Sequence, residues 1–280
     1  MKRRNNEDRM VKGHKPAQSE DPPTMANPLD FINPTEFVAL PSKGRYPTGH
    51  PLQGQDSIEI RYMTAKDEDI LTSKSLLKEG IALDRLIQNL IVNNQISSKD
   101  LYIGDRNAII IYARASAYGD KYKTKVTCPN CSEVSSHTFD LNEYHSYDGA
   151  DYEEFDLEET EHGTFMVTLP MTNIVAEIRP LLGIDEADII KDLKKDKKGE
   201  NGLVTNQIKR FCMSFNGFKD KKTINQVVDR LTAVDSRYLR NAFTAISPDL
   251  SVKGNFICKS CEYEEEMVVP FGTDFFWPDR

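Results

Sequence analysis

Four cysteines in two widely separated pairs place the strongest constraint on how this chain of 280 residues can fold. Cys128 and Cys131 stand in Cys-Pro-Asn-Cys, and Cys258 and Cys261 stand in Cys-Lys-Ser-Cys. The two-residue spacing lets both thiolates of a pair point at one tetrahedral ion, and strand-like residues flank each pair. The sequence therefore predicts a zinc ribbon in which all four cysteines bind one Zn²⁺ ion per chain.

The separation between the two pairs is unusual for a zinc ribbon. Residues 132–257, 126 in all, lie between them, whereas about 15 to 20 residues are usual. A metal held by both pairs would join distant parts of the chain, and its binding free energy would become folding free energy. We therefore expect a structural site in which the two hairpins pair into one ribbon and the residues between them project as an insertion.

Other roles for the cysteines fit the sequence less well. A redox-active pair needs a helix N-terminus to lower the thiol pKa, but both pairs lie between strand-like segments. A catalytic zinc needs an open coordination position, which four cysteines do not leave. His137 could replace a cysteine, although the set is complete without it. The fifth cysteine, Cys212, has the apolar neighbours of a buried free thiol, and this cysteine usage favours a reducing compartment.

Composition and charge exclude several classes of function. Hydrophobic residues make up 39% of the chain and recur periodically, so a packed core is expected. No apolar run approaches the roughly 20 residues that span a bilayer, so we predict no membrane insertion. The first residues lack the apolar stretch of a secretory signal. The net charge of −8 disfavours broad contact with a nucleic-acid backbone.

Periodicity predicts an α+β fold of mixed helices and short antiparallel strands, with a split four-cysteine zinc ribbon and a helical insertion. Residues 57–63 alternate as a half-buried strand, and Thr64 begins a helix. Gly80 divides the apolar helical stretch that follows. Residues 172–250 are expected to be mostly helical, including a helix over 204–215. Beyond the two cysteine hairpins, no repeat with a period of about 20 to 50 residues is present.

The expected organisation follows the same patterns. Residues 140–161 hold ten acidic residues and no Lys or Arg, which is typical of a solvated loop. The predicted parts are a disordered N-terminal tail (1–28), an N-terminal α/β region (29–120), the split zinc ribbon (121–140 and 252–270), an acidic loop (141–163), a mainly helical insertion (164–251) and an aromatic C-terminal anchor (271–280).

No constellation of catalytic residues is evident, so we predict that the protein is not an enzyme and takes no small-molecule substrate. His-Glu-x-x-His, a phosphate-binding Gly-x-x-x-x-Gly-Lys-Ser/Thr loop and a Gly-x-Ser-x-Gly elbow are all absent from the sequence. The adjacent carboxylates Asp67, Glu68 and Asp69 suit helix capping and a surface role. Asp105 is expected to cap a helix that ends at Gly119, with Arg106 as a surface cation.

Binding of nucleic acid is the alternative function, because zinc ribbons often serve that purpose. Four basic residues near the cysteines support it: Lys121, Lys123, Lys125 and Lys253. Four acidic residues beside the second pair oppose it: Glu262, Glu264, Glu265 and Glu266. The charge balance makes nucleic acid the less favoured partner.

Three aromatic residues near the C-terminus, Phe275, Phe276 and Trp277, allow two interpretations. They can fold back as a plug for the chain's own core, or they can anchor the chain in a partner subunit, because aromatic residues dominate interface hot spots. The two interpretations are compatible.

Several motifs together resemble one family. They are Phe37-Val-Ala-Leu-Pro-Ser-Lys-Gly-Arg-Tyr, Ile58-Glu-Ile-Arg-Tyr-Met-Thr-Ala-Lys-Asp-Glu-Asp-Ile-Leu, Gly104-Asp-Arg-Asn-Ala-Ile-Ile-Ile-Tyr-Ala-Arg, Cys128-Pro-Asn-Cys and Phe275-Phe-Trp-Pro. In this order they resemble the baseplate hub proteins, or hub assembly proteins, of T-even-like contractile-tailed phages. The likeness covers residues 31–145 and returns over 252–278.

The resemblance implies a virion component or an assembly factor of the tail baseplate. Such a protein would be made in the host cytoplasm and would act through contacts with other tail proteins. The resemblance implies no catalysis, in agreement with the motif search.

Overall fold

A β-hairpin begins the part of the chain described by the computed structural model, which comprises residues 33–195, 202–269, 271 and 273–276. Strand β1 (Thr35–Ala39) pairs antiparallel with β2 (Ser57–Arg61). Val38, Ile58 and Ile60 are buried on one face, as the alternating pattern predicts. The predicted disordered tail, residues 1–28, lies outside the described residues.

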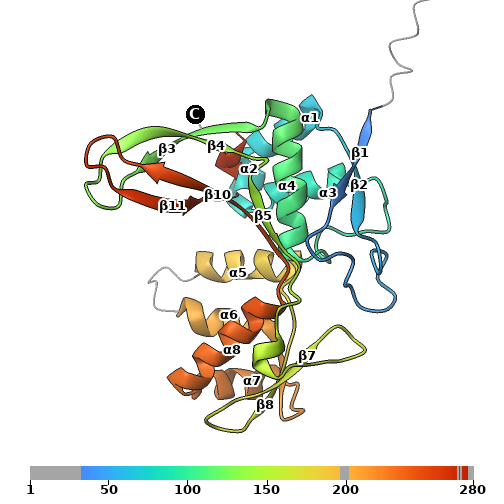
Figure 1. Ribbon diagram of the computed structural model, residues 1–280. Coiled ribbons are helices and arrows are strands. Elements are labelled where there is room, and N and C mark those ends of the chain that lie inside the picture. The colour runs from blue at the N-terminus through green and yellow to red at the C-terminus, as the bar shows by residue number, and fades with distance from the viewer. Residues whose placement is uncertain (1–32, 196–201, 270, 272, 277–280) are drawn as a thin grey trace, which may run out of the picture. The chain divides into compact units, whose positions relative to one another are not determined.

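Helices α1 to α4 follow the hairpin (Figure 1). They are α1 (Ala65–Thr72), α2 (Lys74–Glu79), α3 (Ala82–Leu90) and α4 (Ile103–Tyr118). Thr64 is the N-cap of α1, and Gly80 ends α2 in the left-handed conformation with φ 75°, so both predictions from local sequence are confirmed.

The start of α4 differs from the expectation. Tyr102, not Asp105, occupies the N-cap position, and both Asp105 and Arg106 are buried within the first turn. The predictions of a helix cap and a surface cation were therefore wrong. The Asp105 carboxylate accepts hydrogen bonds from Ser42 N (3.0 Å), Ser42 Oγ (2.7 Å) and the Tyr46 hydroxyl (2.6 Å). These donors make burial of the carboxylate tolerable, although burial still raises its pKa.

Arg106 connects three elements from inside the protein. Its guanidinium lies 2.5 Å from Asp84 of α3 and 3.3 Å from Glu186, and it donates to the Ser98 carbonyl at 2.7 Å. A side chain at Gly183 would not fit here, because its Cβ would lie 2.7 Å from the Ser98 carbonyl oxygen and 2.5 Å from Arg106 Nη1. The buried guanidinium of Arg106 thus connects α3 and α4 with the segment that contains Glu186.

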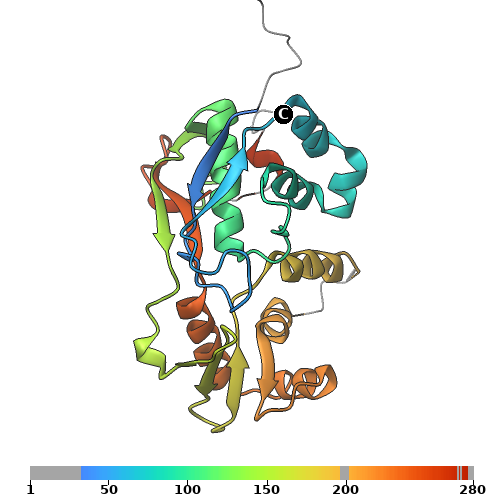
Figure 2. The same cartoon turned by 90° about the vertical axis from the view of Figure 1, so that its right-hand side faces the viewer.

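Helices α5–α8 and four short strands form a second helical region (Figure 2). The helices are α5 (Gly183–Lys195), α6 (Leu203–Phe211), α7 (Lys221–Val228) and α8 (Ala233–Ile246). The strands, in the order of one antiparallel sheet, are β6 (Glu158–Glu159), β7 (Phe165–Thr168), β8 (Val175–Ile178) and β9 (Cys212–Phe215).

Two sequence-based expectations fail in this region. The predicted helix over 204–215 ends at Phe211, and the next four residues form β9 against β8. Ser214 on β9 donates to Glu177 on β8 at 3.0 Å, a long-range contact that local periodicity does not report. Within the predicted acidic loop, 141–163, the chain forms β6 and the strand β5 (Tyr144–Tyr147).

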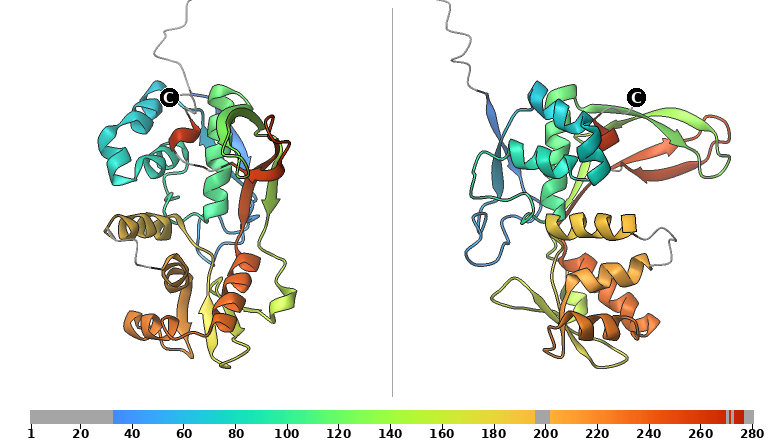
Figure 3. Two further views of the ribbon diagram at one scale, coloured as in Figure 1. Left: turned by 90° about the vertical axis from the view of Figure 1, so that its left-hand side faces the viewer. Right: turned by 180° about the vertical axis from the view of Figure 1, so that it is seen from behind.

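Two hairpins carry the cysteines and lie beside each other in Figures 1 and 3. Strand β3 (Lys121–Thr127) pairs with β4 (Val134–Asp140), and β10 (Asp249–Ile257) pairs with β11 (Glu264–Val268). No backbone ladder joins the hairpins in the part of the chain that the structure describes. Strand β5 instead pairs with the base of β10. The expected single ribbon is therefore two ribbons that meet through their side chains.

Two large apolar cores contain most of the buried hydrophobic side chains in the described part of the chain. The first contains residues of β1–β2, α3 and α4, together with Leu250 and Val252 from the base of β10. The second lies among β7, β8, α6 and α8, with Phe211 stacked on Phe243 at 4.3 Å between ring centroids. The base of β10 thus packs into the first core, while α8, immediately before it, packs into the second.

The C-terminal aromatic residues belong to the first core. Phe275 is 1% exposed and Phe276 is 2% exposed, and the Phe275 ring lies 4.9 Å from that of Tyr122. Arg114 Nε donates to the Phe275 carbonyl at 3.2 Å. Both rings act as a plug for the chain's own core, and neither is open to a partner in this structure. Trp277 lies outside the described residues.

Removing the Phe275 ring tests this placement. Phe275→Ala should lower the free energy of unfolding by about 3–5 kcal/mol, because it empties a fully buried site. Urea denaturation would measure the change. Phe37→Ala is the matched control, since Phe37 is 65% exposed and its loss should cost less than about 0.5 kcal/mol. Equal, small effects of both substitutions would contradict the plug.

Candidate metal centre

Each cysteine pair lies in a tight turn at the end of a hairpin, and the two turns have the same backbone hydrogen bonds. Cys128 N donates to the Glu133 carbonyl at 2.8 Å, and Ser132 N donates to the Cys128 carbonyl at 2.9 Å. In the second hairpin the corresponding distances are 2.8 Å from Cys258 N to Tyr263 and 2.9 Å from Glu262 N to Cys258.

The residue after each second cysteine has a left-handed backbone. Ser132 has φ 61° and Glu262 has φ 56°. Non-glycine residues rarely adopt this conformation, which costs free energy unless the surrounding structure holds it in place. The two turns therefore hold their cysteine side chains in matching arrangements.

The four sulfurs converge at one point. The Sγ atoms of Cys128 and Cys261 lie 3.7 Å apart, and those of Cys131 and Cys258 lie 3.6 Å apart. All four sulfurs are within 4.8 Å of one another. These distances exclude disulfides, and no disulfide links any of the five cysteines, all of which the structure describes. Four thiolates about 2.3 Å from a tetrahedral zinc stand roughly 3.8 Å apart, so the cluster has the dimensions of such a site.

Apolar side chains cover the inner side of the cluster. Cys128 and Cys258 are buried, together with the Phe256 ring, while Cys131 is exposed. Such a setting limits access of water to two of the four sulfurs and strengthens their attraction to a cation. Four cysteine ligands would leave no open position on a bound tetrahedral ion, which is the pattern of a structural rather than a catalytic centre.

The protonation of the thiols is uneven. The backbone N–H of Tyr263 and the amide of Asn130 lower the pKa of Cys261 to about 6. For Cys131 the backbone N–H of Glu133 acts in the same direction, but the hydrogen bond with Cys261 and the other sulfurs outweighs it and raises the pKa to about 12. Metal binding requires deprotonated thiolates, so it is coupled to the release of thiol protons. A divalent ion would take the place of those protons.

His137 is not part of the cluster. Its ring contacts Phe139 at 4.6 Å and Phe256 at 5.8 Å between centroids, and burial lowers its pKa. The only group of metal-ligating side chains found in the described part of the chain consists of the four cysteines. His137 therefore packs as an aromatic ring beside the site.

The basic residues of the hairpins are partly neutralised. Lys121 forms an ion pair with Asp140, and Lys253 lies 3.1 Å from Glu266. The first pair joins β3 to β4, and the second joins β10 to β11. Each cation is therefore held next to a carboxylate of its own hairpin. This arrangement is unfavourable for contact with phosphates.

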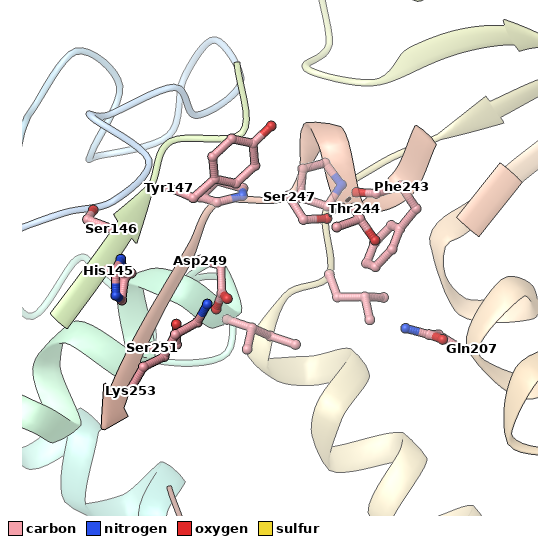
Figure 4. A pocket seen from close by; sticks show the side chains of 14 residues that line it. His145, Ser146, Tyr147, Gln207, Phe243, Thr244, Ser247, Asp249, Ser251 and Lys253 are labelled. Carbon is pink, nitrogen blue, oxygen red and sulfur yellow. Dashed lines mark hydrogen bonds between the residues drawn. The ribbon is translucent and has the colours of Figure 1, made fainter. Parts of the chain in front are cut away.

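A cavity of about 660 Å³ lies near the base of β10, where its lining combines residues of β5, α6 and α8 (Figure 4). Its polar side chains include His145, Asp249 and Lys253. In the described part of the chain no hydrogen bond joins these three groups to one another, and Lys253 pairs with Glu266 instead. The cavity therefore presents no assembled acid–base pair.

The carboxylates Asp67, Glu68 and Asp69 do not gather into a site. Asp67 is buried and receives two hydrogen bonds from Arg61, at 2.7 and 2.9 Å, and a third from Thr64 N at 2.8 Å. Burial alone would raise the pKa of Asp67, but these donors outweigh it and hold the pKa below its usual range. The capping role predicted for this group is confirmed for Asp67, whereas its burial and its Arg61 partner were missed.

Four cysteine sulfurs that converge from two hairpins, inside an α+β fold, form a cluster that could hold a metal ion. The family model described as T4 bacteriophage base plate protein matches residues 35–277. The chain belongs to this family of phage baseplate components, and the resemblance found in its motifs is confirmed. No curated protein and no solved structure matches the chain.

In the described part of the chain, no helix is long and apolar enough to cross a bilayer.

Removing one exposed ligand tests the cluster. Cys131→Ser should abolish stoichiometric binding of zinc or of the spectroscopic probe Co²⁺, because three thiolates leave the tetrahedral set incomplete. Elemental analysis and the thiolate–cobalt absorption bands would measure the loss. Cys212→Ala is the control, since Cys212 is a buried thiol in the second core. A wild-type chain that binds no metal, or a Cys131→Ser chain that binds as well as wild type, would contradict the site.

Proposed function

We propose that the protein is a non-catalytic component or assembly factor of the phage baseplate hub, and that one Zn²⁺ ion per chain clasps its two cysteine hairpins together. Membership of the baseplate family over residues 35–277 carries the first part of this proposal. The convergence of four sulfurs within 4.8 Å supports the second. Zinc is the ion of choice because a closed set of four thiolates suits a tetrahedral, redox-inactive cation.

In this proposal the clasp positions a surface for other tail proteins. Three apolar side chains of the cysteine hairpins are more than half exposed: Val134 (55%), Ile257 (56%) and Val268 (56%). Exposed apolar groups on a rigid hairpin are suited to contacts with another protein. We place the protein in the host cytoplasm during assembly and at the virion tail baseplate, with other baseplate proteins as its partners and neither a membrane nor a small-molecule substrate.

The alternative of nucleic-acid binding receives no comparable support. The hairpin lysines Lys121 and Lys253 are already paired with carboxylates. An enzymatic role lacks an assembled catalytic group in the described residues, and the baseplate family suggests a structural protein.

A complementation experiment tests the proposed function. A phage lacking this protein should regain plaque formation when the host supplies the wild-type chain or Cys212→Ala, but lose at least about tenfold in efficiency with Cys131→Ser. The reason is that the clasp, not a thiol reaction, is required. Tail intermediates and virions would be examined by mass spectrometry and electron microscopy.

Two outcomes would decide against the proposal. Full complementation by Cys131→Ser would show that the metal clasp is dispensable. Normal baseplates in the absence of the protein would remove it from baseplate assembly. Retention of the chain on a DNA or RNA column, in a manner that weakens with salt, would instead favour the nucleic-acid alternative.

A further inference from the structure

A string of residues around β2 and α1 recurs around β8 and α5. Glu59-Ile60-Arg61 is followed, after five residues, by Asp67-Glu68; Glu177-Ile178-Arg179 is followed, again after five residues, by Asp185-Glu186. Every one of these residues recurs 118 positions later in the chain. In both places the string runs from the end of a strand into the first turn of a helix.

The two strings make the same hydrogen bonds. Arg179 donates to the two oxygens of Asp185 at 2.7 and 2.9 Å, the same distances that Arg61 has to Asp67. Each arginine also donates to the carbonyl of the next residue, at 3.0 Å in the first copy and 2.9 Å in the second. Each aspartate accepts from the backbone N–H three residues before it, at 2.8 and 2.9 Å.

The strands that precede these strings also correspond. Val38 of β1 lies opposite Ile58, and Val167 of β7 lies opposite Ala176, so the two hairpins have one register when Ile58 is matched with Ala176. Each first strand continues into Leu-Pro, at residues 40–41 and 169–170.

Each copy also has a second buried aspartate, which accepts a hydrogen bond from the backbone N–H directly after Leu-Pro. The N–H of Ser42, directly after the first Leu-Pro, donates to Asp105 at 3.0 Å. The N–H of Met171, directly after the second Leu-Pro, donates to Asp235 at 2.9 Å. Asp105 lies in the first turn of α4 and Asp235 in the first turn of α8, and both are fully buried.

A third correspondence lies at the ends of α3 and α6. Ile91 follows α3 and bridges to Ile60, while Cys212 follows α6 and pairs with Ile178. The caps also agree, because Ile91 N donates to the Ile87 carbonyl and Cys212 N to the Ile208 carbonyl. The matched turns around Cys128 and Cys258 complete the series.

We infer that the chain is a tandem duplication, in which residues 35–140 and 164–268 are two copies of one unit, and that the metal centre is a bridge to which each copy contributes two cysteines. The copies share the order of a β-hairpin, helices and a cysteine hairpin. Each copy contains the same three kinds of contact: the arginine–aspartate pair, the bond from a backbone N–H to a buried aspartate, and the bridge made by the residue that follows α3 or α6. A single Arg–Asp cap could recur by chance, but three sets of contacts in the same order could not readily do so.

The differences between the copies lie where duplicated proteins tolerate them. The connection between the paired strands is longer in the first copy, where residues 40–56 separate β1 and β2. The region between α6 and α8 is longer in the second copy and contains α7. Connections between elements tolerate such changes of length, and here each connection also adds core residues, among them Tyr46 in the first copy and Ile224 in the second. The copies also diverge in packing, since the base of β10 entered the first core.

The bridging role rests on the proposed zinc clasp, and cutting the chain between the copies tests it. A protease site inserted in the exposed turn between Glu161 and His162 would allow the folded, zinc-loaded full chain to be cut. We expect the two fragments to remain together and to hold one zinc per pair. Removing the zinc with EDTA should lower the urea concentration at which they separate, and EDTA should have no such effect on the cut Cys131→Ser chain.

Two outcomes of this experiment would overturn the bridge: zinc retained at full occupancy by one isolated fragment, or fragments that separate at the same urea concentration with and without zinc. If the intact chain binds no metal, the proposed zinc clasp fails, while the duplication is still decided by an experimental structure. In that structure one rigid superposition should place Asp67 on Asp185, Asp105 on Asp235 and Cys128 on Cys258. A need for different superpositions would refute the duplication.

Discussion

The requirement that four sulfurs meet within 4.8 Å, although two come from residues 128–131 and two from residues 258–261, governs the rest of this structure. Bringing such distant segments together costs loop-closure entropy, which the two cores and, in our proposal, the metal offset. Residues 132–257 must therefore connect the end of the first cysteine turn to the start of the second. The second core, built from β7, β8, α6 and α8, forms within this connecting segment.

Buried or partly buried ion pairs are a second recurring feature of the fold. Arg61 with Asp67, Arg179 with Asp185, and Arg106 with Asp84 each place an ion pair where a strand or loop meets a helix. Breaking such a pair leaves one uncompensated charge, so these contacts specify one arrangement even where their net contribution to stability is small. In a protein whose proposed role is to hold partners, a single well-defined arrangement is a useful property.

Local features of the fold could be predicted from the sequence, and long-range ones could not. The strand over 57–61, the cap at Thr64 and the break at Gly80 follow from periodicity and cap chemistry, and the cysteine cluster follows from spacing alone. Asp105 and Arg106 were misjudged because their partners Ser42, Tyr46 and Asp84 lie 22 or more residues away. Strand β9 was missed because its pairing with β8 overrides a helical pattern.

Because the two proposed copies are synthesised one after the other, the two cysteine pairs of the proposed metal centre become available at different times. A ribosome adds about 5–20 residues per second, so the second cysteine turn emerges roughly 6–26 s after the first, which lies 130 residues earlier. During that interval the nascent first copy offers an ion only two sulfurs, one of them on the exposed Cys131. The centre can be completed within the chain only near the end of synthesis. During this interval the first cysteine hairpin can pair with a cysteine hairpin of a neighbouring chain. A longer interval makes such intermolecular pairing more frequent.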